Sequence, residues 1–273
     1  MRLLLAQLAP RLGDVAANVE RIRSVVQAAP ADLAIFPELY LTGYRVGDHV
    51  HRLALRDGDA TTAQLRAIAR ESRATLIVGA PLVSPQRPGE VQNAVLAVRP
   101  DGEVHVQVKR YLPNFGPFEE GAHFTPTDES HPVPVAARSV GLQICYDTFF
   151  PEVSRALALE GAELLVVVSA SPVTSAALFA RLLPARAIEN SLPVVFVNRV
   201  GVEDGYVFAG GSAAWDARGE SMTLTRVDSA GLAPEEGLFR VDVDPTESAR
   251  WRPFRPVLRD VAMRPGVPPA PAA

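Results

Sequence analysis

Residues 139–168, SVGLQICYDTFFPEVSRALALEGAELLVVV, contain the pattern that decides the fold. The apolar run at 139–144 predicts a strand, Pro151 suits the first turn of a helix, and Gly161 suits the end of that helix. The second apolar run, at 164–168, shows no polar alternation, which predicts a strand covered on both faces. Strand, helix and strand in this order form a β-α-β pattern.

The same alternation recurs along the chain. Further strands are predicted at 3–8, 32–36, 75–78 and 193–198, and further helices are predicted to begin at Asp14, after Asp59 and near Ser175. Apolar runs at 91–98 and 104–108 flank the turn sequence Pro100-Asp101-Gly102 and predict an antiparallel hairpin. Strand signals near Ala213 and Leu224 follow. We therefore expect an α/β fold of two mixed sheets packed together, with helices outside.

The composition is that of a packed globular protein, since 48% of the 273 residues are hydrophobic and 21% are charged. We expect one domain at residues 1–263, because α/β domains commonly reach roughly 200 to 250 residues, followed by a Pro- and Ala-rich tail at 264–273. A net charge of −4 without a basic stripe argues against nucleic acid as a partner. No apolar run approaches the roughly 18 residues of a membrane helix, so we expect a cytoplasmic protein that acts on a small molecule.

Cys145 is the single cysteine, so it cannot form an internal disulfide. A lone cysteine is more often an inert buried residue than a nucleophile. Cys145, however, follows the strand at 139–144 and precedes a helix, which predicts a position at the carboxyl edge of a sheet, where open α/β sheets bind ligands. A nearby helix N-terminus is expected to favour the thiolate, the form that attacks carbonyl carbon.

Two charged residues also lie at predicted strand ends. Glu38 comes just after the strand at 32–36, and Lys109 closes the strand at 104–108. Taken alone, each is more often a solvated surface charge than a functional group. A buried Lys109 beside two carboxylates would stay protonated and could stabilise a developing oxyanion.

These residues occur in segments that resemble one family. IFPE at 35–38, KRYLP at 109–113 and ICYD at 144–147, with FPE at 150–152, resemble the three signatures of the nitrilase superfamily of carbon–nitrogen hydrolases, in the expected order. The resemblance implies that Glu38, Lys109 and Cys145 are catalytic. FEE at 118–120 followed by Phe124 resembles the second glutamate motif of the family and selects Glu120 over Glu119.

The resemblance extends to about Arg240 and implies a four-layer α-β-β-α sandwich that assembles into homodimers or larger homo-oligomers, with no cofactor or metal. In the implied mechanism Glu38 takes the thiol proton and Cys145 attacks the amide carbon. Lys109 and the backbone N–H of Tyr146 hold the oxyanion, and a water activated by Glu38 then hydrolyses the thioester. Glu120 positions Lys109 or the substrate.

The residues after the nucleophile favour an amide over a nitrile, because Tyr146-Asp147 resembles the amidase branches and nitrilases usually have Trp-Glu there. LPNFG at 112–116, GAELL at 161–165 and SASP at 169–172 are similar to the glutaminase domain of glutamine-dependent NAD synthetase. Glutamine itself is not favoured, because Phe115 replaces the expected tyrosine and no basic residue lies between Ser171 and Arg181. The residues expected to line the substrate site are Tyr44, Phe115, Phe150 and Ser171.

We therefore predict hydrolysis of the C–N bond of a small linear amide through a cysteine thioester, which releases ammonia or an amine and a carboxylic acid. Hydrolysis of a nitrile or an N-carbamoyl compound is the alternative within the superfamily. A cysteine peptidase would need a histidine near the thiol, and the five histidines are scattered without a metal-site pattern. An inactive binding protein on the same fold is the non-enzymatic alternative.

Overall fold

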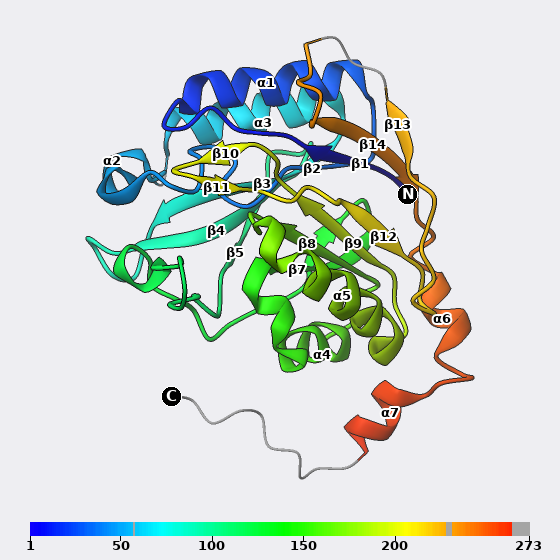
Figure 1. Cartoon of the computed structure of the whole chain (residues 1–273). Coiled ribbons are helices and arrows are strands. Elements are labelled where there is room, and N and C mark those ends of the chain that lie inside the picture. Colours follow the sequence, from blue (N-terminus) through cyan, green and yellow to red (C-terminus); the bar gives the residue numbers. More distant parts are fainter. Residues whose placement is uncertain (57, 228–230, 264–273) are drawn as a thin grey trace.

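Two β-sheets stack between two pairs of helices in the computed structural model, which describes residues 1–56, 58–227 and 231–263 (Figure 1). This arrangement confirms the predicted α-β-β-α sandwich of two mixed sheets. The predicted tail at 264–273 lies outside the described residues.

The first sheet has seven strands in the order β13-β14-β1-β2-β3-β4-β5. Their bounds are β1 (Arg2–Gln7), β2 (Leu33–Ile35), β3 (Thr75–Val83), β4 (Val91–Val98), β5 (Val104–Val108), β13 (Thr225–Val227) and β14 (Gly237–Asp242). The strands β1, β2 and β3 are parallel, and the other pairs are antiparallel. The predicted hairpin is confirmed, since Leu96 of β4 pairs with Val106 of β5.

The second sheet has five strands in the order β12-β9-β8-β7-β6. Their bounds are β6 (Val133–Val135), β7 (Arg138–Ile144), β8 (Leu164–Ser169), β9 (Val194–Asn198) and β12 (Ala213–Trp215). The central strands β7, β8 and β9 are parallel, which confirms the β-α-β unit predicted from residues 139–168. A separate small hairpin joins β10 (Val202–Glu203) to β11 (Tyr206–Val207).

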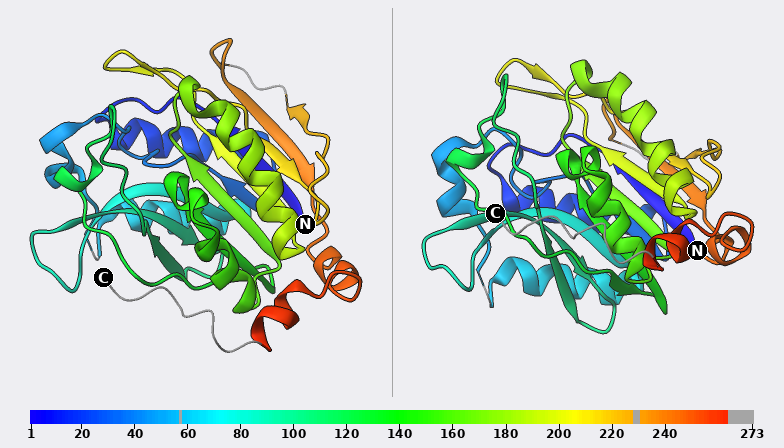
Figure 2. Two further views of the ribbon diagram at one scale, coloured as in Figure 1. Left: turned by 60° about the horizontal axis from the view of Figure 1, so that its bottom comes forward. Right: turned by 90° about the horizontal axis from the view of Figure 1, so that it is seen from below.

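Each sheet is covered on its outer face by one helix pair (Figure 2). The bounds are α1 (Val15–Ala28), α2 (Val50–Leu53), α3 (Ala60–Ser72), α4 (Pro151–Leu159), α5 (Ala176–Asn190), α6 (Glu247–Trp251) and α7 (Val257–Ala262), with 3-10 turns η1 (Gly47–His49), η2 (Glu120–Ala122), η3 (Cys145–Phe149) and η4 (Val173–Ser175). The two predicted helix starts are confirmed, because the side chain of Asp14 accepts a hydrogen bond from Ala17 N and that of Asp59 from Thr61 N. No helix in the described ranges is both long and apolar enough to cross a membrane.

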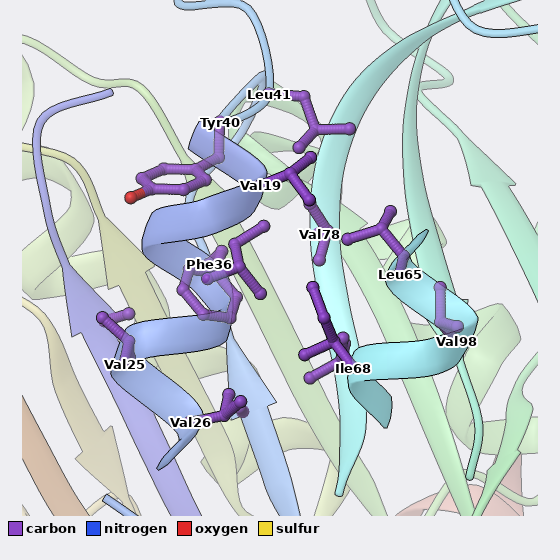
Figure 3. Packing of buried hydrophobic residues seen from close by; sticks show 14 of the residues in the cluster. Val19, Val25, Val26, Phe36, Tyr40, Leu41, Leu65, Ile68, Val78 and Val98 are labelled. Carbon is purple, nitrogen blue, oxygen red and sulfur yellow. The ribbon is translucent and has the colours of Figure 1, made fainter. Parts of the chain in front are cut away.

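Side-chain alternation along the strands produces the layers. In β1, Leu4 and Ala6 face α1 and α3, whereas Leu3 and Leu5 face the second sheet, because successive residues of a strand point to opposite faces. Figure 3 shows the outer layer, in which α1 and α3 pack against side chains such as Phe36 and Val78. The middle layer joins the two sheets through a cluster of buried apolar side chains, which fixes how the sheet edges meet.

Candidate active site

Glu38 lies in a segment that leaves β2 and crosses β3. Its side chain is fully buried, and the backbone beside it passes so close to Gly79 that a Cβ atom there would lie 2.3 Å from the Pro37 carbonyl oxygen. The N–H of Leu41 donates to the Gly79 carbonyl at 3.1 Å and holds the crossing in place. A glycine is therefore required at position 79 for Glu38 to lie where it does.

Lys109 follows β5 and is completely buried. Its Nζ lies 2.7 Å from Glu38 Oε1 and 2.6 Å from Glu120 Oε1. Burial alone would lower the pKa of Lys109, but the carboxylates of Glu120 and Glu38 outweigh that effect and raise it. Lys109 is thus held as an ammonium between two carboxylates.

Glu120, at the start of η2, is the second carboxylate on Lys109, whereas the adjacent Glu119 is exposed. The Tyr44 hydroxyl donates to Glu120 Oε1 at 2.6 Å. Burial and the negative charge of Glu38 raise the pKa of Glu120, and Lys109 offsets part of that rise. The phenol of Tyr44 stays protonated, because burial raises its pKa well above the usual value.

Asn93 of β4 links the two glutamates, a role that the sequence analysis missed. Its Nδ2 donates to Glu38 Oε1 at 2.8 Å and lies 3.4 Å from Glu120 Oε2. The available signal was the pair of amides Gln92 and Asn93 in the otherwise apolar predicted strand VQNAVLAV at 91–98.

Cys145 lies at the turn between β7 and η3, half-buried and with a φ of +46°. Such a left-handed conformation is uncommon outside glycine and persists where the surroundings impose it, often at functional sites. Burial and the nearby charge of Glu38 raise the pKa of the Cys145 thiol, whereas Lys109 lowers it to a lesser degree. The neutral thiol is therefore favoured, and the expectation that a helix N-terminus would make a resting thiolate is wrong, because desolvation dominates.

Asp147 ties the nucleophile turn to the lysine segment. Its Oδ1 accepts from Arg110 N at 3.1 Å and from Tyr111 N at 2.9 Å, and its Oδ2 accepts from Ile144 N at 3.2 Å. One side chain thus fixes the residues after Lys109 relative to the residue before Cys145. In the sequence, Asp147 indicated only a branch of the superfamily.

Two residues after β8 complete the surroundings of Glu38. The N–H of Ala170 donates to Glu38 Oε2 at 2.8 Å, so both oxygens of that carboxylate have partners. Ser171, expected to contact substrate, is buried, and its backbone N–H and carbonyl are both bound by the Asn198 side chain. Ser171 thus follows directly after Ala170, the residue whose N–H binds Glu38.

The other expected substrate-contacting residues form a chain of aromatic rings. Phe115, 53% exposed, lies with its ring 5.3 Å from that of Tyr146. Phe150 stacks on Tyr111 at 3.5 Å and meets Tyr146 edge-on at 5.1 Å. The hydroxyl of Tyr44 donates to Glu120.

A cavity of about 200 Å³ reaches this cluster from the side of Glu120 and Tyr44. It is lined by Tyr44, Arg45, Gly47, Glu119, Glu120, His123, Phe124 and Asp204. Within the described residues, no group of three or more histidine, cysteine, aspartate or glutamate side chains is arranged to bind a metal ion. The chemistry available from this chain is that of a thiol, two carboxylates and an ammonium.

The chain is similar in sequence to known proteins. Residues 2–253 match the carbon-nitrogen hydrolase family. The chain belongs to this family. The (R)-stereoselective amidase of a Pseudomonas species is 34% identical over 254 residues, which cover 92% of this chain and 88% of that protein. The predicted family is thereby confirmed.

Two further relatives of this carbon–nitrogen hydrolase are informative. The glutamine-dependent NAD(+) synthetase of Rhodobacter capsulatus is 35% identical, and the match covers 97% of this chain but 47% of the synthetase, so the chain spans about half the length of that relative. A variant of the amidase from Nesterenkonia sp. AN1 has 30% identity and a TM-score of 0.76, with 93% of this chain and 94% of that chain covered. In that variant the acetamide moiety of fluoroacetamide is added covalently at the active-site cysteine.

Proposed function

We propose that this protein is an amidase that hydrolyses a small linear amide through a thioester on Cys145, releasing ammonia or an amine and a carboxylic acid. The observation that supports this function best is the fully buried Lys109 held between Glu38 and Glu120, since an enclosed ammonium can stabilise a developing oxyanion. The family membership and the amidases among the relatives support the same reaction class.

In the proposed first step, Glu38 removes the thiol proton while Sγ of Cys145 bonds to the amide carbon. The need for a base is supported by the raised pKa of the thiol, which leaves little thiolate at neutral pH. The carbonyl π electrons move to oxygen, and Lys109 together with the N–H of Tyr146 stabilises that negative charge. The C–N bond then breaks, and the nitrogen leaves with the proton that Glu38 had taken.

In the second step, Glu38 takes a proton from water as the water oxygen attacks the thioester carbon. The C–S bond breaks, the thiol regains its proton from Glu38, and the carboxylic acid leaves. Glu120 keeps its position on Lys109 throughout, which keeps the ammonium directed at the oxyanion. No cofactor is needed for the balance of atoms or charge.

The rings at the site suggest which acyl groups would fit. Phe115 and Phe150 pack on Tyr146, the residue next to the nucleophile, so the acyl group would have aromatic rings on that side of the site. An α-carboxylate such as that of glutamine would find no basic residue between Ser171 and Arg181. We therefore expect amides with short uncharged acyl groups to be better substrates than glutamine.

The test is an amide panel that includes acetamide, propionamide, benzamide and glutamine, with a nitrile and an N-carbamoyl amino acid alongside. Ammonia release, hydroxamate formation in the presence of hydroxylamine, and an acyl adduct in the mass of acid-quenched enzyme are expected for an uncharged amide. Cys145→Ala is expected to lose the adduct and to lower turnover by roughly 10⁴-fold or more, because a methyl group cannot attack carbon. Turnover only of the nitrile or the N-carbamoyl compound, no turnover at all, or an active Cys145→Ala variant would contradict the proposal.

A further inference from the structure

A buried ion pair outside the proposed reaction lies close to the site. Arg199, which follows β9, is 1% exposed, and its guanidinium binds Glu203 Oε1 and lies 4.0 Å from the centre of the Phe208 ring. Burying an ion pair is costly and seldom adds much net stability. A contribution to stability therefore does not by itself explain why the Arg199–Glu203 pair is buried next to the site.

The second oxygen of Glu203 holds the segment that contains Tyr44. Glu203 Oε2 accepts from Tyr44 N at 2.9 Å and from Arg45 N at 2.9 Å, across 159 and 158 residues of sequence. Just before Tyr44, Gly43 has a φ of +82°, and a Cβ there would lie 2.8 Å from Glu203 Oε1. The chain thus turns tightly around this carboxylate, and the carboxylate fixes where the Tyr44 backbone lies.

Tyr44 connects this fixed backbone to Glu120 and Lys109. Its hydroxyl donates to Glu120 Oε1 at 2.6 Å, the same oxygen that lies 2.6 Å from Lys109 Nζ. Its ring is held edge-on by Phe208 at 6.1 Å, and Phe208 is the ring beneath Arg199. The ion pair thus supports both ends of Tyr44, the backbone through Glu203 and the ring through Phe208.

From this connected geometry we infer that Glu203, oriented by Arg199, is a positioning residue that sets the Tyr44 hydroxyl on Glu120 and thereby the ammonium of Lys109. The consequence for turnover rests on the proposed function. The consequence for the electrostatics of Cys145 does not, because the charges of Glu120, Glu38 and Lys109 act on the thiol without any substrate.

The first test therefore needs no substrate. Cys145 is the single cysteine, so its alkylation by iodoacetamide can be followed against pH in the wild type, Glu203→Gln and Tyr44→Phe. The ionisable groups facing Glu120 are Lys109, Glu38 and Tyr44, and loss of the Tyr44 hydrogen bond raises the pKa of Glu120. The pH profiles of both variants are expected to shift from that of the wild type in the same direction. A Glu203→Gln profile that coincides with the wild type would overturn the inference.

The second test is a double-mutant cycle on amide hydrolysis. Tyr44→Phe is expected to lower kcat by about tenfold, as for a lost hydrogen bond to a charged group. Glu203→Gln is expected to lower kcat similarly in the wild type but by less than about twofold in the Tyr44→Phe background, since the two act through one contact. Multiplicative effects would refute the connection. Absence of turnover in the wild type would refute the proposed function instead and leave the alkylation result standing.

Glu236→Gln is the matched control, because Glu236 is also a buried carboxylate that binds one arginine, Arg21, and accepts backbone N–H bonds. It makes none of its hydrogen bonds to the site residues. The alkylation profile and the kcat of Glu236→Gln are therefore both expected to match the wild type after correction for melting temperature. Where Glu203→Gln does not fold, Arg199→Lys replaces it, since lysine keeps the charge but loses the planar fork of donors. Arg199→Lys is then expected to shift the pH profile of alkylation in the same direction and to show the same non-additive effect on kcat with Tyr44→Phe.

Discussion

Gly79→Ala is expected to lower amide hydrolysis without touching any reacting group. An added Cβ would lie 2.3 Å from the Pro37 carbonyl oxygen, 2.4 Å from Leu39 N and 2.7 Å from the carbonyl carbon of Glu38. All three are backbone atoms, so no side-chain rotation relieves the contact. Ordinary contact begins near 3.4 Å, and the segment that contains Glu38 must therefore move by about 1 Å.

A displacement of about 1 Å at a catalytic group commonly costs about 10²-fold in rate. We therefore expect kcat to fall about 100-fold, a barrier increase of about 2.7 kcal/mol. Thermal unfolding should also shift downward, because the displaced segment loses the Leu41 N to Gly79 carbonyl bond. The assay is steady-state amide hydrolysis on protein shown to be folded by circular dichroism at the assay temperature.

Gly141→Ala provides the matched control. Gly141 lies in β7 of the other sheet, and a Cβ there meets only side-chain atoms, the nearest being Leu165 Cδ2 at 2.7 Å. Its stability should fall while kcat of the folded protein changes by less than about threefold, since flexible leucine side chains can yield. If Gly79→Ala folds and keeps wild-type kcat, the Glu38 backbone is not fixed by this crossing and the reasoning fails.

Three further predictions concern single groups. Glu120→Gln is expected to lower kcat by about 10²-fold, whereas the exposed Glu119→Gln should leave it within about twofold, and equal losses would contradict the placement of Glu120 on Lys109. Asn93→Ala should lower kcat by about tenfold because it releases Glu38, and unchanged kinetics would refute that link. Burial raises the pKa of Asp147 to about 7, so the native state keeps a proton that the unfolded chain loses near 3.8. The unfolding free energy should then fall by up to about 4 kcal/mol as the pH rises from about 3.8 to about 7. Asp147→Asn should flatten that pH dependence in urea titrations.

The local patterns of the sequence were sufficient to predict the strand that is buried on both faces and the helices that are buried on one face. The continuous apolar run of β8 and the capped, amphipathic α1 and α3 were predicted because propensity and environment agree there. The strand β14 was not predicted, although it lies between β13 and β1 as the second strand of the seven-stranded sheet. Its short sequence gains its stability from pairing with a strand more than 230 residues away, which a local window does not contain.

For the site, the sequence supplied the reactive residue types and their order, whereas the contacts among them depend on how the two sheets stack. Glu38 and Lys109 come from the first sheet and Cys145 from the second, and the apolar layer between the sheets sets their separation. The protonation state of Cys145 shows the difference most clearly. Sequence proximity to a helix suggested a thiolate, but the surrounding desolvation and Glu38 favour the thiol.

The sequence by itself determined that this chain is an α/β carbon–nitrogen hydrolase with one thiol, because strand and helix periodicity and three short motifs are local properties. Only the tertiary structure decided that Asn93, Asp147 and the Arg199–Glu203 pair belong to the surroundings of the site. Each of them has a contact with a residue between 27 and 159 positions away, and such contacts exist only after both sheets have formed and packed.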